Sequence, residues 1–200
     1  PYAPDSRLYL NELYIDLERL PEFYGSEKAQ QQFHTPEFQA TLQTLRESRR
    51  VDYGAIATAK RTMLELTYQQ FLSEAYSGEE PTLQPKRASA LLFEQFIRSE
   101  GAPLEAYATF QTLEEERRLI QSKSTTWHDW PTQFLTPGPP AREYAKRHRK
   151  RIRFFQYIQW VAREQLNEVR QMAEQLAMPI GLYHDLALGA DRNGAEAWIY

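Results

Sequence analysis

The sequence predicts a mainly α-helical chain with one short strand near its end. Apolar residues recur every three or four positions through much of residues 27–177, which is the spacing of helices that bury one face. An apolar run follows the last of these helices, at 178–188, and its length is typical of a buried strand. The 42% hydrophobic and 13% aromatic content is enough for a packed core.

Residues 1–24 predict a loop. Proline, aspartate and serine are frequent in the first six residues and favour turns. The stretch 8–17 has tyrosine and isoleucine residues that suit a strand, but Asn11 and Glu12 interrupt the pattern. We therefore expect a loop with a short extended piece at most.

Two helix starts can be placed from their capping residues. Thr35, followed by proline and glutamate, predicts a start inside a weakly helical region at 27–47. Asp52 is the expected cap of a helix over roughly 53–76, whose apolar face is regular.

The middle of the chain predicts two further helices and two irregular segments. The helices cover 86–99 and 104–121, on either side of a break at Gly101-Ala-Pro103. Residues 78–85 are expected to form a linker. Residues 122–140 are irregular, and they contain a Trp-x-x-Trp-Pro element at 127–131. The predicted place of Trp127 and of Trp198 is the core.

The last predicted helix, 141–177, is long and bends near 148–151, where basic residues cluster. The strand predicted at 178–188 carries a polar pair, His184-Asp185. Ligands of α/β barrels bind at the carboxyl ends of strands and on the loops that follow. A carboxylate at such a position can bind a ligand, so Asp185 is the strongest site candidate. The alternative is a structural carboxylate that pairs with an arginine or caps a turn.

Composition excludes several classes of protein. A net charge of −3 does not favour nucleic-acid binding as a global property. The absence of cysteine excludes disulfides and fits a reducing compartment, so a cytoplasmic location is expected. No apolar run reaches membrane-spanning length, and no signal peptide is evident. The four histidines are not spaced as metal ligands, and there is no phosphate-binding glycine loop, so we expect neither a metal nor a cofactor.

The basic run 142–153 leaves an alternative function open. Basic residues with neighbouring aromatics can bind nucleic acid or an acidic partner, which would make the chain a non-enzymatic helical interaction module. A solvated helix surface is the simpler interpretation, because the neighbouring aromatic Phe155 lies on the predicted buried stripe and the rest of the chain is acidic.

Three patches resemble one family, the 4-α-glucanotransferases (amylomaltases) of the glycoside hydrolases. The first is Pro1-Tyr-Ala-Pro-Asp-Ser-Arg-Leu-Tyr-Leu-Asn-Glu-Leu-Tyr-Ile-Asp16, and the second is Val51-Asp-Tyr53 at a helix start. The third begins with Phe155, Trp160 and Gln165-Leu166 and continues through Gly181-Leu-Tyr-x-Asp-Leu-Ala-x-Gly189 to Gly194-Ala-Glu-Ala-Trp198. Residues 80–140 match little beyond the Trp-x-x-Trp-Pro element.

The resemblance implies the early part of a (β/α)8 TIM-barrel enzyme with an inserted helical subdomain. It assigns 1–24 to a substrate-side loop, 25–140 to the inserted subdomain, and 141–200 to a barrel helix, a strand and the following loop. The family transfers α-1,4-glucan segments between maltodextrins with retention, by way of a carboxylate nucleophile and a carboxylic acid. These groups lie on later strands of the family, so we expect this chain to be a piece without catalytic residues, inactive by itself.

The resemblance also implies the ligand and its contacts. Tyr2 and Asp185 match family positions that touch bound glucan, and Ser6 and Arg7 share the loop of Tyr2. The expected partners are α-1,4-glucans and maltooligosaccharides, with no nucleic acid and no membrane. The missing strands should leave apolar surface exposed, so self-association or marginal stability of the isolated chain is expected.

Overall fold

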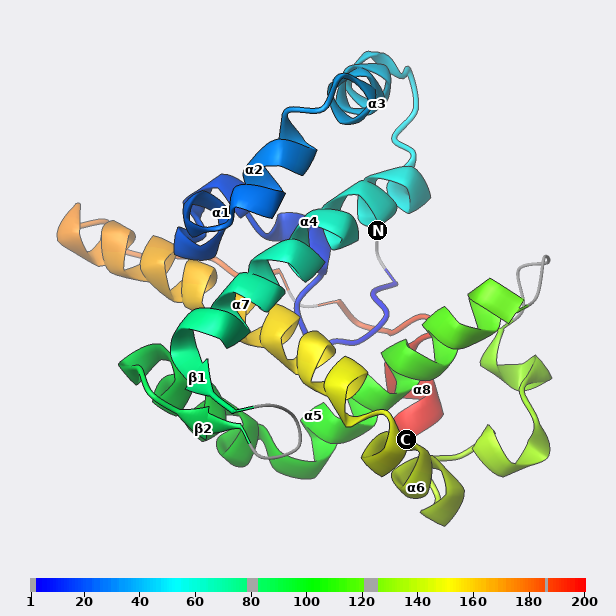
Figure 1. The fold of residues 1–200 in the computed structure, drawn as a ribbon. Coiled ribbons are helices and arrows are strands. Elements are labelled where there is room, and N and C mark those ends of the chain that lie inside the picture. Colours follow the sequence, from blue (N-terminus) through cyan, green and yellow to red (C-terminus); the bar gives the residue numbers. More distant parts are fainter. Residues whose placement is uncertain (1–2, 79–82, 121–125, 186) are drawn as a thin grey trace. The chain divides into compact units, whose positions relative to one another are not determined.

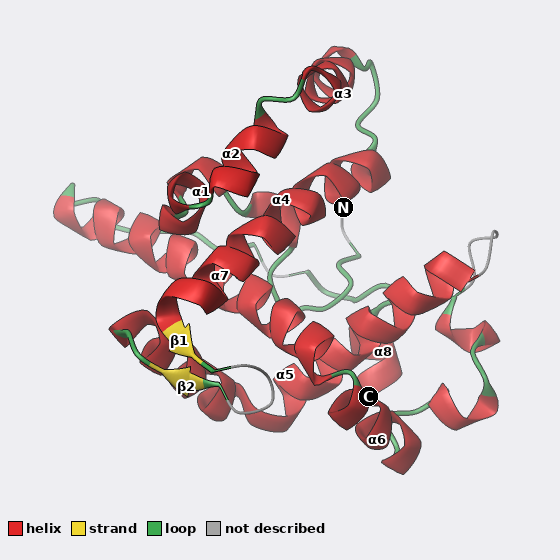
Figure 2. Cartoon of the chain, viewed as in Figure 1, coloured by secondary structure: helices red, strands yellow, loops and turns green. Residues whose placement is uncertain are grey.

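The computed structural model describes residues 3–78, 83–120, 126–185 and 187–200 (Figure 1). The chain forms two compact units: one consists of Glu12–Leu92, and the other of Pro1–Asn11 together with Phe93–Tyr200. We call them the 12–92 unit and the 93–200 unit. Helices account for most of the described residues, as Figure 2 shows, and the prediction of a mainly α-helical chain is confirmed.

The 12–92 unit consists of short helices packed on one long helix. Its elements are η1 (Glu12–Tyr14), η2 (Leu17–Arg19), α1 (Pro21–Gly25), α2 (Glu27–Phe33), α3 (Pro36–Glu47), α4 (Tyr53–Ala75), β1 (Tyr76–Ser77), β2 (Gln84–Pro85) and the start of α5 (Ala88–Ile120). The predicted caps are present: Thr35 Oγ1 accepts a hydrogen bond from the Phe38 amide, and Asp52 accepts one from the Ala55 amide.

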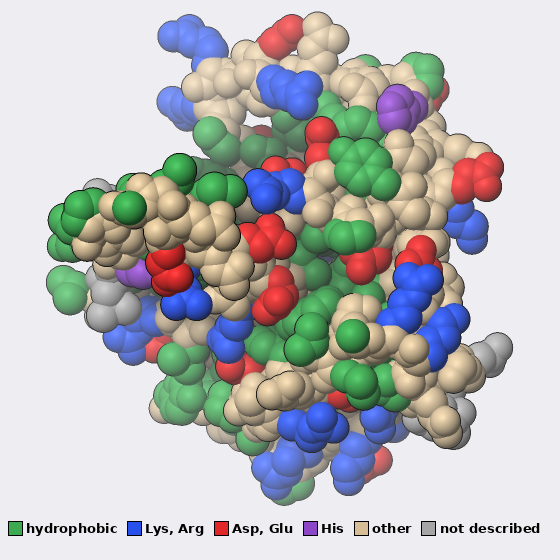
Figure 3. Space-filling view, turned by 90° about the vertical axis from the view of Figure 1, so that its left-hand side faces the viewer, with side chains coloured by type: hydrophobic (Ala, Val, Ile, Leu, Met, Phe, Trp, Pro, Cys, Tyr) green, Lys and Arg blue, Asp and Glu red, His purple; other side chains and the backbone are tan. Residues whose placement is uncertain are grey.

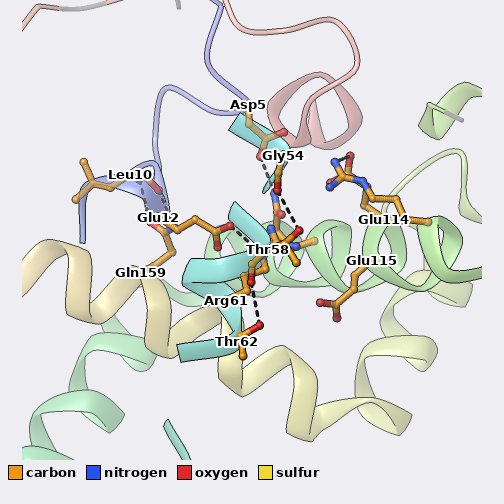
Figure 4. A network of polar contacts seen from close by, with 12 residues as sticks. Asp5, Leu10, Glu12, Gly54, Thr58, Arg61, Thr62, Glu114, Glu115 and Gln159 are labelled. Atoms are coloured by element: carbon orange, nitrogen blue, oxygen red, sulfur yellow. Dashed lines mark hydrogen bonds and ion pairs between the residues drawn. The ribbon is translucent and has the colours of Figure 1, made fainter. Parts of the chain in front are cut away.

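The long helix α4 holds the 12–16 loop by its charged side chains as well as by packing. Lys60 Nζ donates to the carbonyls of Leu13 (2.6 Å) and Ile15 (2.7 Å), and burial lowers its pKa. Arg61 Nε donates to Glu12 Oε1 at 2.8 Å (Figure 4). The backbone carbonyls of this loop therefore find their partners on a neighbouring helix.

A small hairpin that the sequence analysis did not predict follows α4. Strands β1 and β2 pair antiparallel, with Tyr76 opposite Pro85 and Ser77 opposite Gln84. Strand β2 lies in the segment expected to be a linker, whereas β1 lies at the predicted end of the preceding helix. Within the described residues, this is the only sheet.

The 93–200 unit contains most of α5, then η3 (Trp127–Asp129), η4 (Thr132–Phe134), α6 (Pro139–Arg147), α7 (Arg149–Gln175) and α8 (Ala195–Ile199). The two helices predicted on either side of Gly101 are present, joined by a kink at which Gly101 has φ 60° and ψ −139°. This left-handed φ is one that glycine adopts at little cost.

The predicted bend in the last long helix is a break between α6 and α7. His148 leaves the helical conformation, with φ −105° and ψ 26°, and its ring stacks on Tyr144 with centroids 3.8 Å apart. Helix α7 ends where Ala177 adopts φ 52° and the Met178 amide donates to the Ala173 carbonyl, a left-handed helix end.

Aromatic side chains form the core of the 93–200 unit. The rings of Phe110, Trp130 and Trp198 lie within 5.2–6.2 Å of one another. Phe93 meets Tyr157 edge to face at 6.1 Å. Such contacts stabilise beyond the area they bury, and they hold α5, α7 and α8 together.

The strand predicted at 178–188 is wrong for the described residues of that segment, which form no strand. Ile180, Tyr183 and Leu188 are 83–96% exposed, so the apolar run is not buried either. A strand needs neighbouring backbone groups for its hydrogen bonds, and the only sheet of the described residues lies in the other unit. The local pattern cannot supply that partner.

None of the helices formed by the described residues is both long and apolar enough to span a membrane.

Candidate functional site

The predicted substrate-side loop lies against helix α8, and Asp5 makes the contact. Asp5 Oδ1 accepts a hydrogen bond from the Ala195 amide (2.9 Å), and its carbonyl accepts one from the Glu196 amide (3.1 Å). Asp5 Oδ2 accepts from Gln111 Nε2 of α5 at 2.6 Å. One residue thus joins the loop to two helices.

Gly194 makes this close approach possible. A Cβ atom on Gly194 would stand 2.5 Å from the carbonyl oxygen of Asp5 and 2.8 Å from its Cα. Backbone atoms cannot swing aside as a side chain can, so only glycine fits here. The neighbouring turn adds a second link, because the Asp191 amide donates to the Pro4 carbonyl at 2.8 Å.

Arg7 and Glu196 form an ion pair that fixes the other end of the loop. The backbone amide of Arg7 donates to Glu196 Oε2 (2.7 Å), its Nε donates to Oε1 (2.7 Å), and Nη2 also contacts Oε1. The Arg7 side chain nevertheless stays 43% exposed. Its hydrogen bonds lower the pKa of Glu196, and the Arg7 pKa is raised in return.

Burial gives Asp5 a pKa of about 6, well above the ordinary value of 3.8. The hydrogen bonds from Ala195 and Gln111 oppose this rise, whereas the charges of Glu114 and Asp191 add to it. The loop therefore contains a carboxyl group that changes charge near neutral pH.

The loop continues into the core of the 93–200 unit. The Gln159 side chain of α7 accepts from the Leu10 amide and donates to the Leu10 carbonyl, both at 2.9 Å (Figure 4). Tyr9 packs on Tyr107 with ring centroids 4.4 Å apart. The loop has no regular strand, yet both ends of its described part are held.

The four predicted site residues have different surroundings. Tyr2 lies outside the described residues. Ser6 is buried, and its hydroxyl accepts from the Leu8 amide at 3.1 Å. Asp185 is exposed, in a segment without regular structure. Arg7 Nη1 lies 3.5 Å from the Leu188 carbonyl, so the loop reaches the segment that carries Asp185.

The two tryptophans predicted in the core differ in burial. Trp198 is buried, and its Nε1 donates to the Phe134 carbonyl at 2.7 Å, which confirms that prediction. Trp127 is only half-buried: it stacks on His128 and donates to the Arg192 carbonyl at 3.2 Å. The prediction for Trp127 was wrong because its short 3-10 helix lies at the surface.

The basic run 142–153 is only partly a solvated surface. Arg153 is buried and pairs with Glu94 at 2.6 Å, and Arg151 pairs with Glu115. The other cations of the run are exposed: Arg142, Lys146, Arg147, Arg149 and Lys150. The inner arginines therefore serve the fold, and an interaction module based on the outer ones stays a prediction.

Metal chemistry finds no support in the part of the chain that the structure describes. No group of three or more His, Cys, Asp or Glu side chains there is arranged to hold a metal ion.

Asp5 and Glu196 are site residues that the sequence analysis did not single out. Both lie inside the patches of family resemblance, but Asp5 appeared as one of several turn-forming residues. The pairs that they form join residues about 190 positions apart. A local pattern carries no signal for such a pairing.

Comparison with known proteins assigns the chain to a family. The family model of the 4-alpha-glucanotransferases, glycoside hydrolase family 77, matches residues 1–200, so the chain belongs to that family. A 4-alpha-glucanotransferase of Haemophilus influenzae is 32% identical over 99% of this chain and 28% of its own length. One of Mycobacterium tuberculosis is 29% identical over 99% of the chain and 25% of its length.

A third relative, the 4-alpha-glucanotransferase of Chlamydia pneumoniae, is 24% identical over the full chain and 33% of its own length. The chain thus spans between a quarter and a third of these relatives. The family resemblance found in the sequence is confirmed.

Proposed function

We propose that this chain binds α-1,4-glucans as part of a 4-α-glucanotransferase. The observation that carries the proposal is the family match over all 200 residues. The relatives are three to four times longer than this chain. Their activity is therefore only inferred for the protein to which this chain belongs. The docked loop at 3–8 supports the proposal, because it brings family-like residues from both ends of the chain together.

The proposed reaction of the parent enzyme is transfer of a glucan segment to the 4-hydroxyl of another glucan. In a retaining double displacement, one carboxylate attacks the sugar and a carboxylic acid protonates the leaving oxygen. We place these groups on a (β/α)8 barrel outside residues 1–200. This chain then supplies glucan-binding walls and no catalytic residue.

Four residues are proposed to contact the glucan. Asp185 offers an exposed carboxylate that can accept two sugar hydroxyls. Arg7 is 43% exposed, and its Nη1 has a second N–H besides the one directed at the Leu188 carbonyl. Ser6 is proposed from its motif position, because its side chain is buried and its hydroxyl accepts from the Leu8 amide. Tyr2 is proposed from its motif alone, as an aromatic face with a polar tip.

A binding titration tests the proposed contacts. Maltoheptaose is titrated into the wild-type chain, Asp185→Asn and a control, Asp129→Asn, whose carboxylate caps its own 3-10 helix. We expect Asp185→Asn to weaken binding roughly tenfold, as for one charge-assisted hydrogen bond, and the control to bind like wild type. Equal affinity of all three chains would remove Asp185 from the site.

Release of glucose from maltotriose tests where the chemistry lies. We expect no release above background by the 200-residue chain. Sustained release would mean that a working pair of carboxylates lies within residues 1–200. The proposal that the catalytic carboxylates lie outside these residues would then be wrong.

A further inference from the structure

The side chain and the backbone of Arg7 are held by one carboxylate, that of Glu196 on α8. Glu196 Oε1 accepts hydrogen bonds from Nε of Arg7 at 2.7 Å and from Nη2. Glu196 Oε2 accepts one from the Arg7 backbone amide, also at 2.7 Å. On the same guanidinium, Nη1 donates to the Leu188 carbonyl at 3.5 Å. The direction of the Arg7 side chain is therefore set by α8 and by the segment that carries Asp185.

Glu196 is itself fixed, so it can hold its partner in place. Its side chain is only 11% exposed. The Glu196 amide donates to the Asp5 carbonyl at 3.1 Å, which ties its backbone to the loop of residues 3–8. Because both carboxylate oxygens accept from Arg7 and the side chain is largely buried, Glu196 is poorly placed to contact a ligand itself.

The Arg7 guanidinium keeps donors for a ligand outside this pair. An arginine side chain has five N–H groups. Glu196 takes the N–H of Nε and one of Nη2, and the Leu188 carbonyl takes one of Nη1. Within the described residues, no other acceptor meets the second N–H of Nη1 or of Nη2, and the side chain is 43% exposed. Two donors on one rigid plane suit a pair of neighbouring sugar hydroxyls.

We propose that Glu196 is a positioning residue for glucan binding, which holds the Arg7 guanidinium so that its remaining N–H groups can donate to glucan hydroxyls. An unrestrained arginine on a loop samples many rotamers, and fixing it when a ligand binds costs free energy. Glu196 imposes that order before any ligand arrives. This inference deepens the proposed function and rests on it.

Glutamine at position 196 should loosen Arg7 without changing the size of the side chain. A glutamine side chain has one acceptor oxygen, and its amide nitrogen is a donor that cannot meet another N–H. Glu196→Gln can therefore hold either the Arg7 amide or the guanidinium, but not both. We expect the restored freedom of Arg7 to weaken glucan binding roughly two- to tenfold.

A double-mutant cycle on the full chain separates positioning from a general structural role. Maltoheptaose affinity is measured for wild type, Glu196→Gln, Arg7→Ala and the double variant. If Glu196 acts through Arg7, Glu196→Gln weakens binding in the wild-type chain but does not weaken it further once Arg7 is replaced. A merely structural Glu196 would weaken binding by the same factor in both backgrounds, and that result would overturn the inference. Glu174→Gln is the matched control and should bind like wild type, because Glu174 pairs with Arg170 on the exposed surface of α7.

The order of the Arg7 side chain can be measured in the wild-type chain without sugar. Nitrogen-15 relaxation of arginine Nε–H groups reports their motion on the picosecond to nanosecond timescale. We expect an order parameter near that of rigid backbone, about 0.8, for Arg7 and one below about 0.6 for Arg147, an exposed arginine of α6. A mobile Arg7 side chain would overturn the inference, even if Glu196→Gln does not fold.

Binding by the wild-type chain separates failure of the proposed function from failure of this inference. If wild type does not bind maltoheptaose, the proposed function fails and the positioning role of Glu196 fails with it. If wild type binds maltoheptaose and Glu196→Gln binds equally well, the proposed function stands and only the positioning role fails.

Discussion

Asp5 occupies a place in the fold where its oxygens find hydrogen-bond donors but its negative charge is unfavourable. Its oxygens meet two donors, yet burial and two acidic neighbours oppose ionisation. A carboxyl group with a strongly raised pKa is more often found at a functional site than in an ordinary surface turn. Asp5 is therefore a candidate functional residue, and it lies between Tyr2 and Ser6, the positions that the family resemblance singled out.

Replacing Asp5 by asparagine should raise the free energy of unfolding at neutral pH. The folded-state pKa of about 6 exceeds the unfolded value of 3.8, so wild type loses stability as the pH rises from 4 to 6. Asparagine avoids that loss, and we expect a gain of about 2 kcal/mol at pH 7 and none at pH 4. Urea unfolding at both pH values measures it, with the exposed Asp185→Asn as control. A destabilised Asp5→Asn at pH 7 would contradict the expectation.

Replacing Arg153 by alanine should strongly destabilise the chain. Its guanidinium is buried, pairs with Glu94 and lies 5.3 Å from the Phe93 ring centroid. Removing one member of a buried ion pair strands the other, which costs about 3–5 kcal/mol. Lys150→Ala, at an exposed position of the same helix, should change the free energy of unfolding by less than about 0.5 kcal/mol. Similar losses in both variants would show that burial of Arg153 contributes nothing.

At the scale of elements, helix α8 depends on the 3–8 loop for its N-terminal cap. It has five residues, and its N-cap Gly194 has no side chain to supply a capping acceptor. Asp5 supplies that acceptor from the other end of the sequence. Helix α8 and the 3–8 loop should therefore form and open together.

Gly194→Ala tests this dependence. The new Cβ would stand 2.5 Å from the Asp5 carbonyl oxygen, so loop and helix must separate. We expect a loss of about 2 kcal/mol or more in stability, as for overpacking against backbone. Gly189→Ala is the matched control, because no atom lies within 4 Å of its Cβ position. Equal melting temperatures of the two variants would refute the close contact.

The helices could be predicted because their determinants are local. Thr35, Asp52 and Gly101 each act within one helical turn, and the structure has the predicted caps and break. The residues at 178–188 show the opposite case. An apolar run indicates that a segment can be buried. A strand also needs a neighbouring strand for its backbone hydrogen bonds, and the spacing of residues in the sequence does not reveal that partner.

The candidate site could be predicted only in part. Ser6 and Arg7 were found through their motif, and the structure places both on a docked loop. Their partner Glu196 and the docking residue Asp5 depend on contacts between opposite ends of the chain. Pairings of this kind arise from tertiary packing and leave no periodic pattern in the sequence.

At the scale of the whole molecule, apolar side chains remain at the surface near the end of α7. Val169, Met172 and Leu176 recur at helical spacing and are 50–67% exposed. Ile180 and Tyr183 follow and are more exposed still. Figure 3, which faces the side where this end of α7 lies in Figure 1, shows hydrophobic side chains at the surface. Exposed apolar surface of this kind favours association.

The isolated chain is therefore expected to self-associate. Sedimentation at increasing concentrations should show a shift from monomer to larger species in the micromolar range. A variant with Val169, Met172 and Leu176 all changed to glutamine should stay monomeric at the same concentrations. A wild-type chain that remains monomeric throughout would contradict this expectation.

The proposed function depends on recognition of the α-1,4 linkage. The most direct measurement is calorimetric titration of the wild-type chain at pH 5 with maltoheptaose and, separately, with cellohexaose, a β-1,4-linked glucan. We expect saturable binding of maltoheptaose and none of cellohexaose. Failure to bind maltoheptaose, or equal affinity for both sugars, would contradict the claim that these residues form part of an α-1,4-glucan site.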